Sequence, residues 1–224
     1  WGEDGPTRMH PEHLLFSGRY FVILSFPDRE PAMAWFETEM TKRLEPLAPH
    51  DWSALQPLVK QVFAEYTKQD AAAGLKLLKD HADEIRDYGF GQYLQGELAL
   101  MAKDWDLAET SYGRAIELND SGGDPLPNPP TILWASVDGL AMALLSDGKV
   151  DDAAKAFERA VALSGRMGDD AQTGKCLYNY ACSLSRAGRF EDSLAALTES
   201  IQLAPEHKAL AAKDSDFAKA RARP

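Results

Sequence analysis

The chain has 224 residues, of which 45% are hydrophobic and 26% are charged. These values are typical of a folded globular chain, and they exclude collagen-like, disordered and disulfide-dependent mini-protein classes. Because 24 Lys and Arg residues stand against 35 Asp and Glu residues, the formal net charge is −11. An acidic surface repels phosphate backbones and anionic lipid, so neither nucleic-acid binding nor membrane-surface binding is expected.

The sequence predicts no membrane-spanning segment and no secretory leader. The longest fully apolar stretch, residues 20–24, is far shorter than the roughly 20 residues that a spanning helix needs. Cys176 and Cys182 lie six residues apart within one helical pattern, which suits neither a disulfide nor a chelate. A reducing compartment follows, and we expect a cytoplasmic protein.

The first predicted unit, residues 1–50, is a β-α segment. Residues 19–26 are rich in aromatic and β-branched side chains and predict a strand, while residues 30–47 predict a helix with Pro31 in its first turn. A lone strand leaves unpaired edges. It therefore needs residues 9–16, a segment outside this chain, or a second copy of the chain as its partner, and the last case would make a homodimer through this strand.

The next unit, residues 51–87, is predicted to be a degenerate helical hairpin. Residues 52–66 and 69–85 each show an amphipathic helical pattern. Within the first of them one apolar stripe runs along the helix, formed by Leu55, Leu58, Val59, Val62, Phe63 and Tyr66.

An internal repeat dominates residues 88–224. The stretches 94–118, 139–163 and 179–203 align at spacings of 45 and 40 residues. Each has apolar residues at intervals of three and four, a break such as Gly148-Lys149 or Gly188-Arg189, and then a second pattern of the same kind, which predicts two helices joined by a short turn. Small residues face bulky ones at fixed spacing: Gly96, Ala141 and Ala181 in first helices, with Ala108, Ala153 and Ser193 followed four residues later by Tyr112, Phe157 and Leu197 in second helices.

This arrangement resembles the tetratricopeptide repeat (TPR) family. The family's Ala-x3-aromatic pair is matched by Ala108-x3-Tyr112 and Ala153-x3-Phe157, and its closing proline by Pro205. The spacings exceed the minimal repeat of about 34 residues because the joints between hairpins are longer. The last stretch is similar to an end-of-group variant of the repeat. The resemblance implies a mainly α, right-handed α-solenoid with a C-terminal capping helix.

The resemblance also implies where a partner binds. First helices of such arrays line a concave groove that contacts a peptide or protein. Transferred position by position, the expected partner-binding residues are Phe90, Tyr93, Glu97, Met101, Asp138, Met142, Lys175, Tyr178, Asn179, Cys182 and Arg186. Only Lys175 and Asn179 match the carboxylate-clamping positions of chaperone-binding repeats, so we do not expect a chaperone co-factor.

The residues that could bind a metal, act as a nucleophile or stack on a ligand are better explained by structural roles. His10 and His13 flank Pro11 and are not expected to hold a metal. The acidic, glycine-rich residues 119–124 lack the register of a calcium loop. Cys182 could be a reactive thiol next to Arg186, but a small core filler is favoured, and Asp214 and Asp216 are interpreted as helix caps. Trp105 and Trp134 are assigned to the core rather than to ligand stacking.

The sequence therefore predicts a non-enzymatic interaction scaffold, without metal or cofactor, that binds a peptide or protein in its groove. The alternative is that the repeats form the regulatory or oligomerising part of a larger protein whose enzymatic or sensory domain is not in this chain. The first hypothesis rests on the strong repeat register, and the second on the orphan strand and on the absence of an initiator Met at residue 1.

Overall fold

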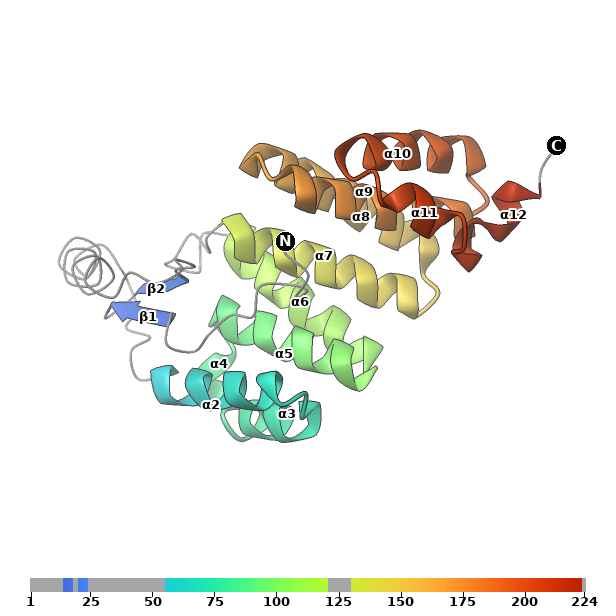
Figure 1. Ribbon diagram of the computed structural model, residues 1–224. Coiled ribbons are helices and arrows are strands. Elements are labelled where there is room, and N and C mark those ends of the chain that lie inside the picture. The colour runs from blue at the N-terminus through green and yellow to red at the C-terminus, as the bar shows by residue number, and fades with distance from the viewer. Residues whose placement is uncertain (1–13, 18–19, 24–54, 121–129, 223–224) are drawn as a thin grey trace.

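A computed structural model describes residues 14–17, 20–23, 55–120 and 130–222. Successive antiparallel helical pairs stack along the chain (Figure 1). The pairs are α2 (Gln56–Thr67) with α3 (Ala71–Asp80), α5 (Gly89–Ala102) with α6 (Trp105–Asp120), α7 (Pro130–Ser146) with α8 (Val150–Met167), and α9 (Asp170–Arg186) with α10 (Phe190–Leu203). The short helix α4 (Ala82–Ile85) links the first pair to the second, and α11 (His207–Ala211), the 3₁₀ turn η4 (Ser215–Phe217) and α12 (Ala218–Arg221) follow the last. This stacking is that of an α-solenoid.

Each hairpin turns through one residue with a left-handed backbone. Gly148 and Gly188 fill this position in the last two hairpins, with φ of 83° and 80°, as the predicted breaks require. Gln69 and Lys103 fill it in the first two, with φ of 60° and 59°. The turn geometry is therefore the same in all four hairpins although glycine occupies only two of the turns.

The large-into-small packing predicted from the repeats is present. Tyr112 of α6 is fully buried between two first helices. A Cβ atom added at Gly96 of α5 would lie 2.7 Å from the Tyr112 ring, and one added at Gly139 of α7 would lie 2.3 Å from it. Both glycines are thus required for the ring to join neighbouring hairpins.

The next junction repeats this packing with different residues. Ala153 and Phe157 of α8 are fully buried in one apolar cluster with Ala141 of α7, and Tyr180 of α9 packs against it. In the last hairpin Ser193 stands where alanine is expected, and its hydroxyl donates to the Ala181 carbonyl oxygen at 2.8 Å. The serine is therefore accommodated by a hydrogen bond between the two helices.

The region before the repeats differs in detail from expectation. The helix expected over 69–85 is interrupted at His81, whose backbone (φ −117°, ψ 26°) leaves the helical range between α3 and α4. A strand β2 (Tyr20–Ile23) pairs antiparallel with β1 (Leu14–Ser17), with Leu14 opposite Ile23. The helix expected over 30–47 lies outside the described residues, so the β-α segment and the division at residues 50 and 87 stay predictions.

Among the described residues, no helix has the length and apolar character that crossing a bilayer demands.

Candidate functional site

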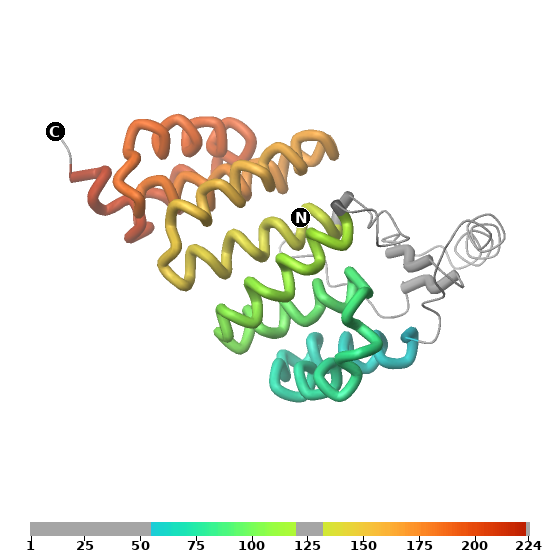
Figure 2. The backbone as a smooth tube through the Cα atoms, turned by 180° about the vertical axis from the view of Figure 1, so that it is seen from behind, coloured from blue at the N-terminus to red at the C-terminus, as the bar shows by residue number. Residues whose placement is uncertain are grey.

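The first helices α5, α7 and α9 together form one face, called here the first-helix face. Helix α5 packs against α7 directly. Helix α7 meets α9 where the Trp134 indole Nε1 donates to the Cys176 Sγ at 3.3 Å. Figure 2 shows the same helices from behind, with the last hairpin continuing the stack beyond α7. Trp134 is buried, as expected of a core residue.

Glu97 lies on the α5 part of this face, where both of its carboxylate oxygens accept hydrogen bonds. Its Oε1 accepts a hydrogen bond from the Tyr112 hydroxyl at 2.6 Å, and its Oε2 accepts one from the Tyr66 hydroxyl at 3.2 Å. Burial raises the pKa of the Glu97 carboxyl, the nearby Asp138 raises it further, and the two hydroxyls and Lys175 offset part of this shift. Burial, the Glu97 charge and the hydrogen bond to Glu97 raise the pKa of Tyr66 to about 12. Tyrosines from α2 and α6 thus hold one carboxylate in place on α5.

Asp138 is the corresponding group on α7. It is 8% exposed, and its Oδ1 accepts from the Cys176 thiol at 3.5 Å, a weak hydrogen bond. Burial raises the pKa of Asp138, while Lys175 and the thiol lower it. The same burial, together with the Asp138 charge, raises the pKa of Cys176 to about 12, so this thiol stays protonated and unreactive at neutral pH.

Tyr93 lies one helical turn before Glu97 on α5. Its side chain is 6% exposed, and its ring packs at 5.8 Å from the Phe90 ring and 6.3 Å from the Tyr112 ring, measured between centroids. Burial, followed by the charges of Glu97 and Asp138, raises the Tyr93 pKa well above its usual value. Tyr93 is therefore a neutral phenol placed among acidic neighbours.

The remaining predicted residues are divided between this face and the core. Phe90 is 1% exposed and stacks on the Phe63 ring at 5.9 Å, so it belongs to the core. Met142 and Asn179 are partly exposed. Met101, Lys175 and Arg186 are exposed. Lys175 directly precedes Cys176, whose thiol donates to Asp138, so the backbone of Lys175 on α9 lies next to this part of α7.

Tyr178 and Cys182, also predicted to face the groove, are buried beneath the C-terminal segment. The Tyr178 hydroxyl donates to Asp214 Oδ2 at 2.8 Å, and its ring lies 5.7 Å from the Phe217 ring. The Tyr178 and Cys182 side chains are 6% and 5% exposed. Both are covered because residues 207–217 pack where a further hairpin would stack, which the expected groove positions did not take into account.

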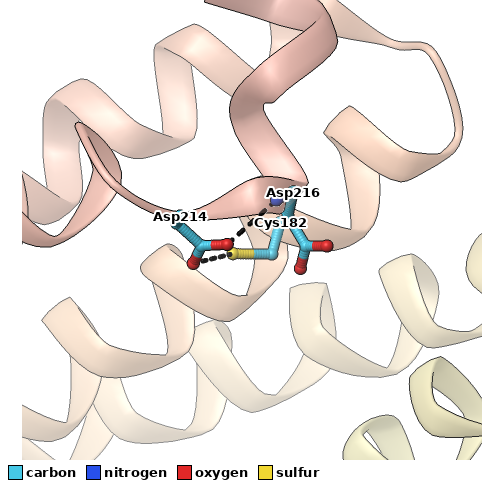
Figure 3. A group of neighbouring side chains, drawn as sticks. All are labelled: Cys182, Asp214 and Asp216. Atoms are coloured by element: carbon cyan, nitrogen blue, oxygen red, sulfur yellow. Dashed lines mark hydrogen bonds between the residues drawn. The ribbon is translucent and has the colours of Figure 1, made fainter.

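Cys182, Asp214 and Asp216 form a compact cluster at this end of the array (Figure 3). Their ligand atoms lie within 4.8 Å of one another. Asp214 Oδ1 accepts from the Asp216 backbone N–H at 2.9 Å, which makes Asp214 the N-cap of η4, as predicted. Burial and then Asp214 raise the Cys182 pKa, so the thiol stays protonated despite Arg186, in agreement with a core filler rather than a nucleophile.

Comparison with known proteins agrees with the hairpins and their packing. Residues 131–206, which span α7 to α10, match the tetratricopeptide repeat family. Helices α7 to α10 are therefore assigned to the tetratricopeptide repeat family. The chain is also 26% identical over 116 residues to small glutamine-rich tetratricopeptide repeat-containing protein 2 of Mycosarcoma maydis, an alignment that covers 52% of this chain and 28% of that protein. A TPR array of this kind is a scaffold for protein–protein interaction.

Sequence reasoning missed three groups of the site. Tyr66 and Tyr112 were assigned to apolar packing, yet their hydroxyls bind Glu97. Cys176 was treated only as a free thiol, yet it connects Trp134 to Asp138. The available signal was the choice of Tyr over Phe at two core positions, because a buried hydroxyl requires a partner. His10, His13 and residues 121–124 lie outside the described residues.

Proposed function

We propose that this TPR chain is a non-enzymatic adaptor that holds a segment of a partner protein against its first-helix face. The observation that supports this is the mixed character of that face: Glu97 is fixed in place by two tyrosine hydroxyls, and the exposed Met101 lies one turn further along α5. A surface that combines a fixed polar group with an exposed apolar side chain offers a partner segment both kinds of contact. No comparison favours the alternative in which the repeats serve an enzymatic or sensory domain outside this chain.

A pair of matched variants tests this adaptor function. M101R/N179R places two guanidinium groups on the first-helix face, at one exposed and one partly exposed position. A162R/L194R adds the same charge at exposed positions of the second helices α8 and α10, where Leu194 is 65% exposed. Partners captured from a lysate of the source organism with the wild-type chain are then purified and titrated against all three proteins by calorimetry.

We expect M101R/N179R to weaken the purified complex at least tenfold, which corresponds to about 1.4 kcal/mol, and A162R/L194R to leave it unchanged. Circular dichroism melts check that both variants are folded. Loss of binding in A162R/L194R alone would assign the interaction to the second helices and contradict the proposal.

A further inference from the structure

The outer face of the last second helix, α10, is more exposed than the equivalent face of α8. Leu194 of α10 is 65% exposed, whereas Ala154, at the equivalent repeat position 40 residues earlier on α8, is 2% exposed. Ala154 lies in one apolar cluster with Leu177 and Ala181 of α9, the first helix of the next hairpin. Leu194 therefore occupies a position at which a following hairpin normally stacks, and its large apolar side chain lies in solvent instead.

A second leucine is exposed just past α10. Leu210 of α11 is 52% exposed, and among the large apolar side chains of the described residues only Leu194 and Leu210 are more than half exposed. Beyond α11 the chain crosses to α9, where the Asp216 carbonyl oxygen accepts from the Ser185 hydroxyl at 2.7 Å. The elements that carry both leucines lie at the same end of the array (Figure 1).

Charge at this end is divided between two elements of opposite sign. Helix α10 carries three acidic side chains and no basic one, whereas residues 207–221 carry four basic side chains and two acidic ones. Glu191 of α10 and Lys208 of α11 are both exposed, and within the described part of the chain neither forms an ion pair. A surface with one acidic and one basic half is complementary to a copy of itself that is turned by a two-fold axis.

We infer that this end of the chain is a homodimer interface in which α10 lies antiparallel along α10 of a second copy. The start of α10, with Glu191 and Leu194, then lies opposite the stretch just past the end of the other α10, which carries Lys208 and Leu210. Each copy covers the exposed leucines of the other, and each acidic helix meets a basic segment. The occupant is a second copy because this chain itself carries both complementary halves. The same contact occurs twice, so assembly closes at two chains.

Sedimentation velocity of the full chain over a wide range of concentrations tests the dimer. We expect a reversible monomer–dimer equilibrium. L194R should weaken the dimer at least tenfold, because it replaces a leucine of the interface with a cation beside the basic segment of the other copy. A162R adds the same charge at an exposed position of α8 and should change the dissociation constant less than twofold. A wild-type chain that stays monomeric at every concentration would overturn the inference.

Exchange of one charge pair tests the antiparallel arrangement. E191K and K208E should each self-associate at least tenfold more weakly than wild type, because each places like charges opposite one another in both contacts. An equimolar mixture of the two variants should recover a mixed dimer, since unlike charges then face one another in both contacts. Circular dichroism melts check that each variant is folded. A mixture that associates no better than either variant alone would contradict the interface.

The dimer does not depend on the proposed adaptor function, because the first-helix face belongs to α5, α7 and α9. A162R/L194R should therefore be monomeric and still bind the purified partner with the affinity that each wild-type chain has. A dimer that persists in A162R/L194R would remove the interface and leave the adaptor function standing. Partner binding that is lost only in M101R/N179R, while that variant stays dimeric, supports both.

Discussion

The two acids of the first-helix face should make stability depend on pH. Burial raises the folded-state pKa of Glu97 and of Asp138 above the unfolded values. Between the unfolded and the folded pKa values, the folded chain therefore holds protons that the unfolded chain has released. The free energy of unfolding should therefore fall as the pH rises from the ordinary carboxyl pKa, about 4, through the raised values.

E97Q/D138N should flatten this fall, since amides do not titrate. Urea unfolding at a series of pH values measures the effect, with E158Q/E199Q as the control for net charge. The prediction fails if wild type and E97Q/D138N lose stability in parallel over this window.

At the same scale, two glycine substitutions test the packing of Tyr112. Gly139→Ala puts a methyl group into the Tyr112 ring and should cost about 1–3 kcal/mol, because the ring cannot move without losing its bond to Glu97. Gly113→Ala lies in α6 with nothing within 4 Å of its new Cβ, and it should stabilise by about 0.5–1 kcal/mol through helix propensity. Equal effects in denaturant titrations would contradict the close approach at Gly139.

At the scale of helices, Phe157 joins one hairpin to the next. Its ring is fully buried with Ala141 and Ala153 and is covered by Tyr180 from α9. Phe157→Ala should destabilise by about 3–5 kcal/mol, and because the lost contacts lie between units it should also broaden the unfolding transition. Calorimetry measures both the loss of stability and the width of the unfolding transition. A loss of unfolding free energy below about 1 kcal/mol would mean that Phe157 does not lie at the junction between the hairpins.

How far the sequence predicts these elements depends on whether the signal is local. Hairpins α5 to α10 follow from periodicity, with glycine marking two of their three turns, and the packing of Tyr112 against Gly96 follows from residue size. The site was predicted less completely: Glu97, Asp138 and Lys175 lie on first helices and stay predicted binding residues, whereas Phe90 is in the core and Tyr178 is covered. Periodicity identifies the inward side of a helix, whereas coverage depends on which later segment packs there. The end-of-group resemblance of the last stretch predicts a C-terminal cap but not which residues of α9 that cap covers.

At the scale of the whole molecule, the C-terminal segment closes the last hairpin, and Cys182 reports on that closure. Phe217 is 4% exposed, packs on Tyr178 and lies in the segment that carries Asp214. Phe217→Ala should loosen residues 207–221 and raise the rate of Cys182 alkylation at least tenfold. Cys176, fully buried between α7 and α9, is the internal control and should stay slow. Mass spectrometry of the labelled peptides separates the two thiols.

The same closure also bears on self-assembly. A stack of hairpins presents at each end a surface suited to one more hairpin, so a second molecule could add there, and repeated head-to-tail addition would build an open filament. Here Tyr178 and Ser185 of α9 are already bonded to the chain's own residues, Tyr178 to the Asp214 carboxylate and Ser185 to the Asp216 carbonyl at 2.7 Å. A second molecule that stacks on this side of α9 would therefore have to displace these two hydrogen bonds first.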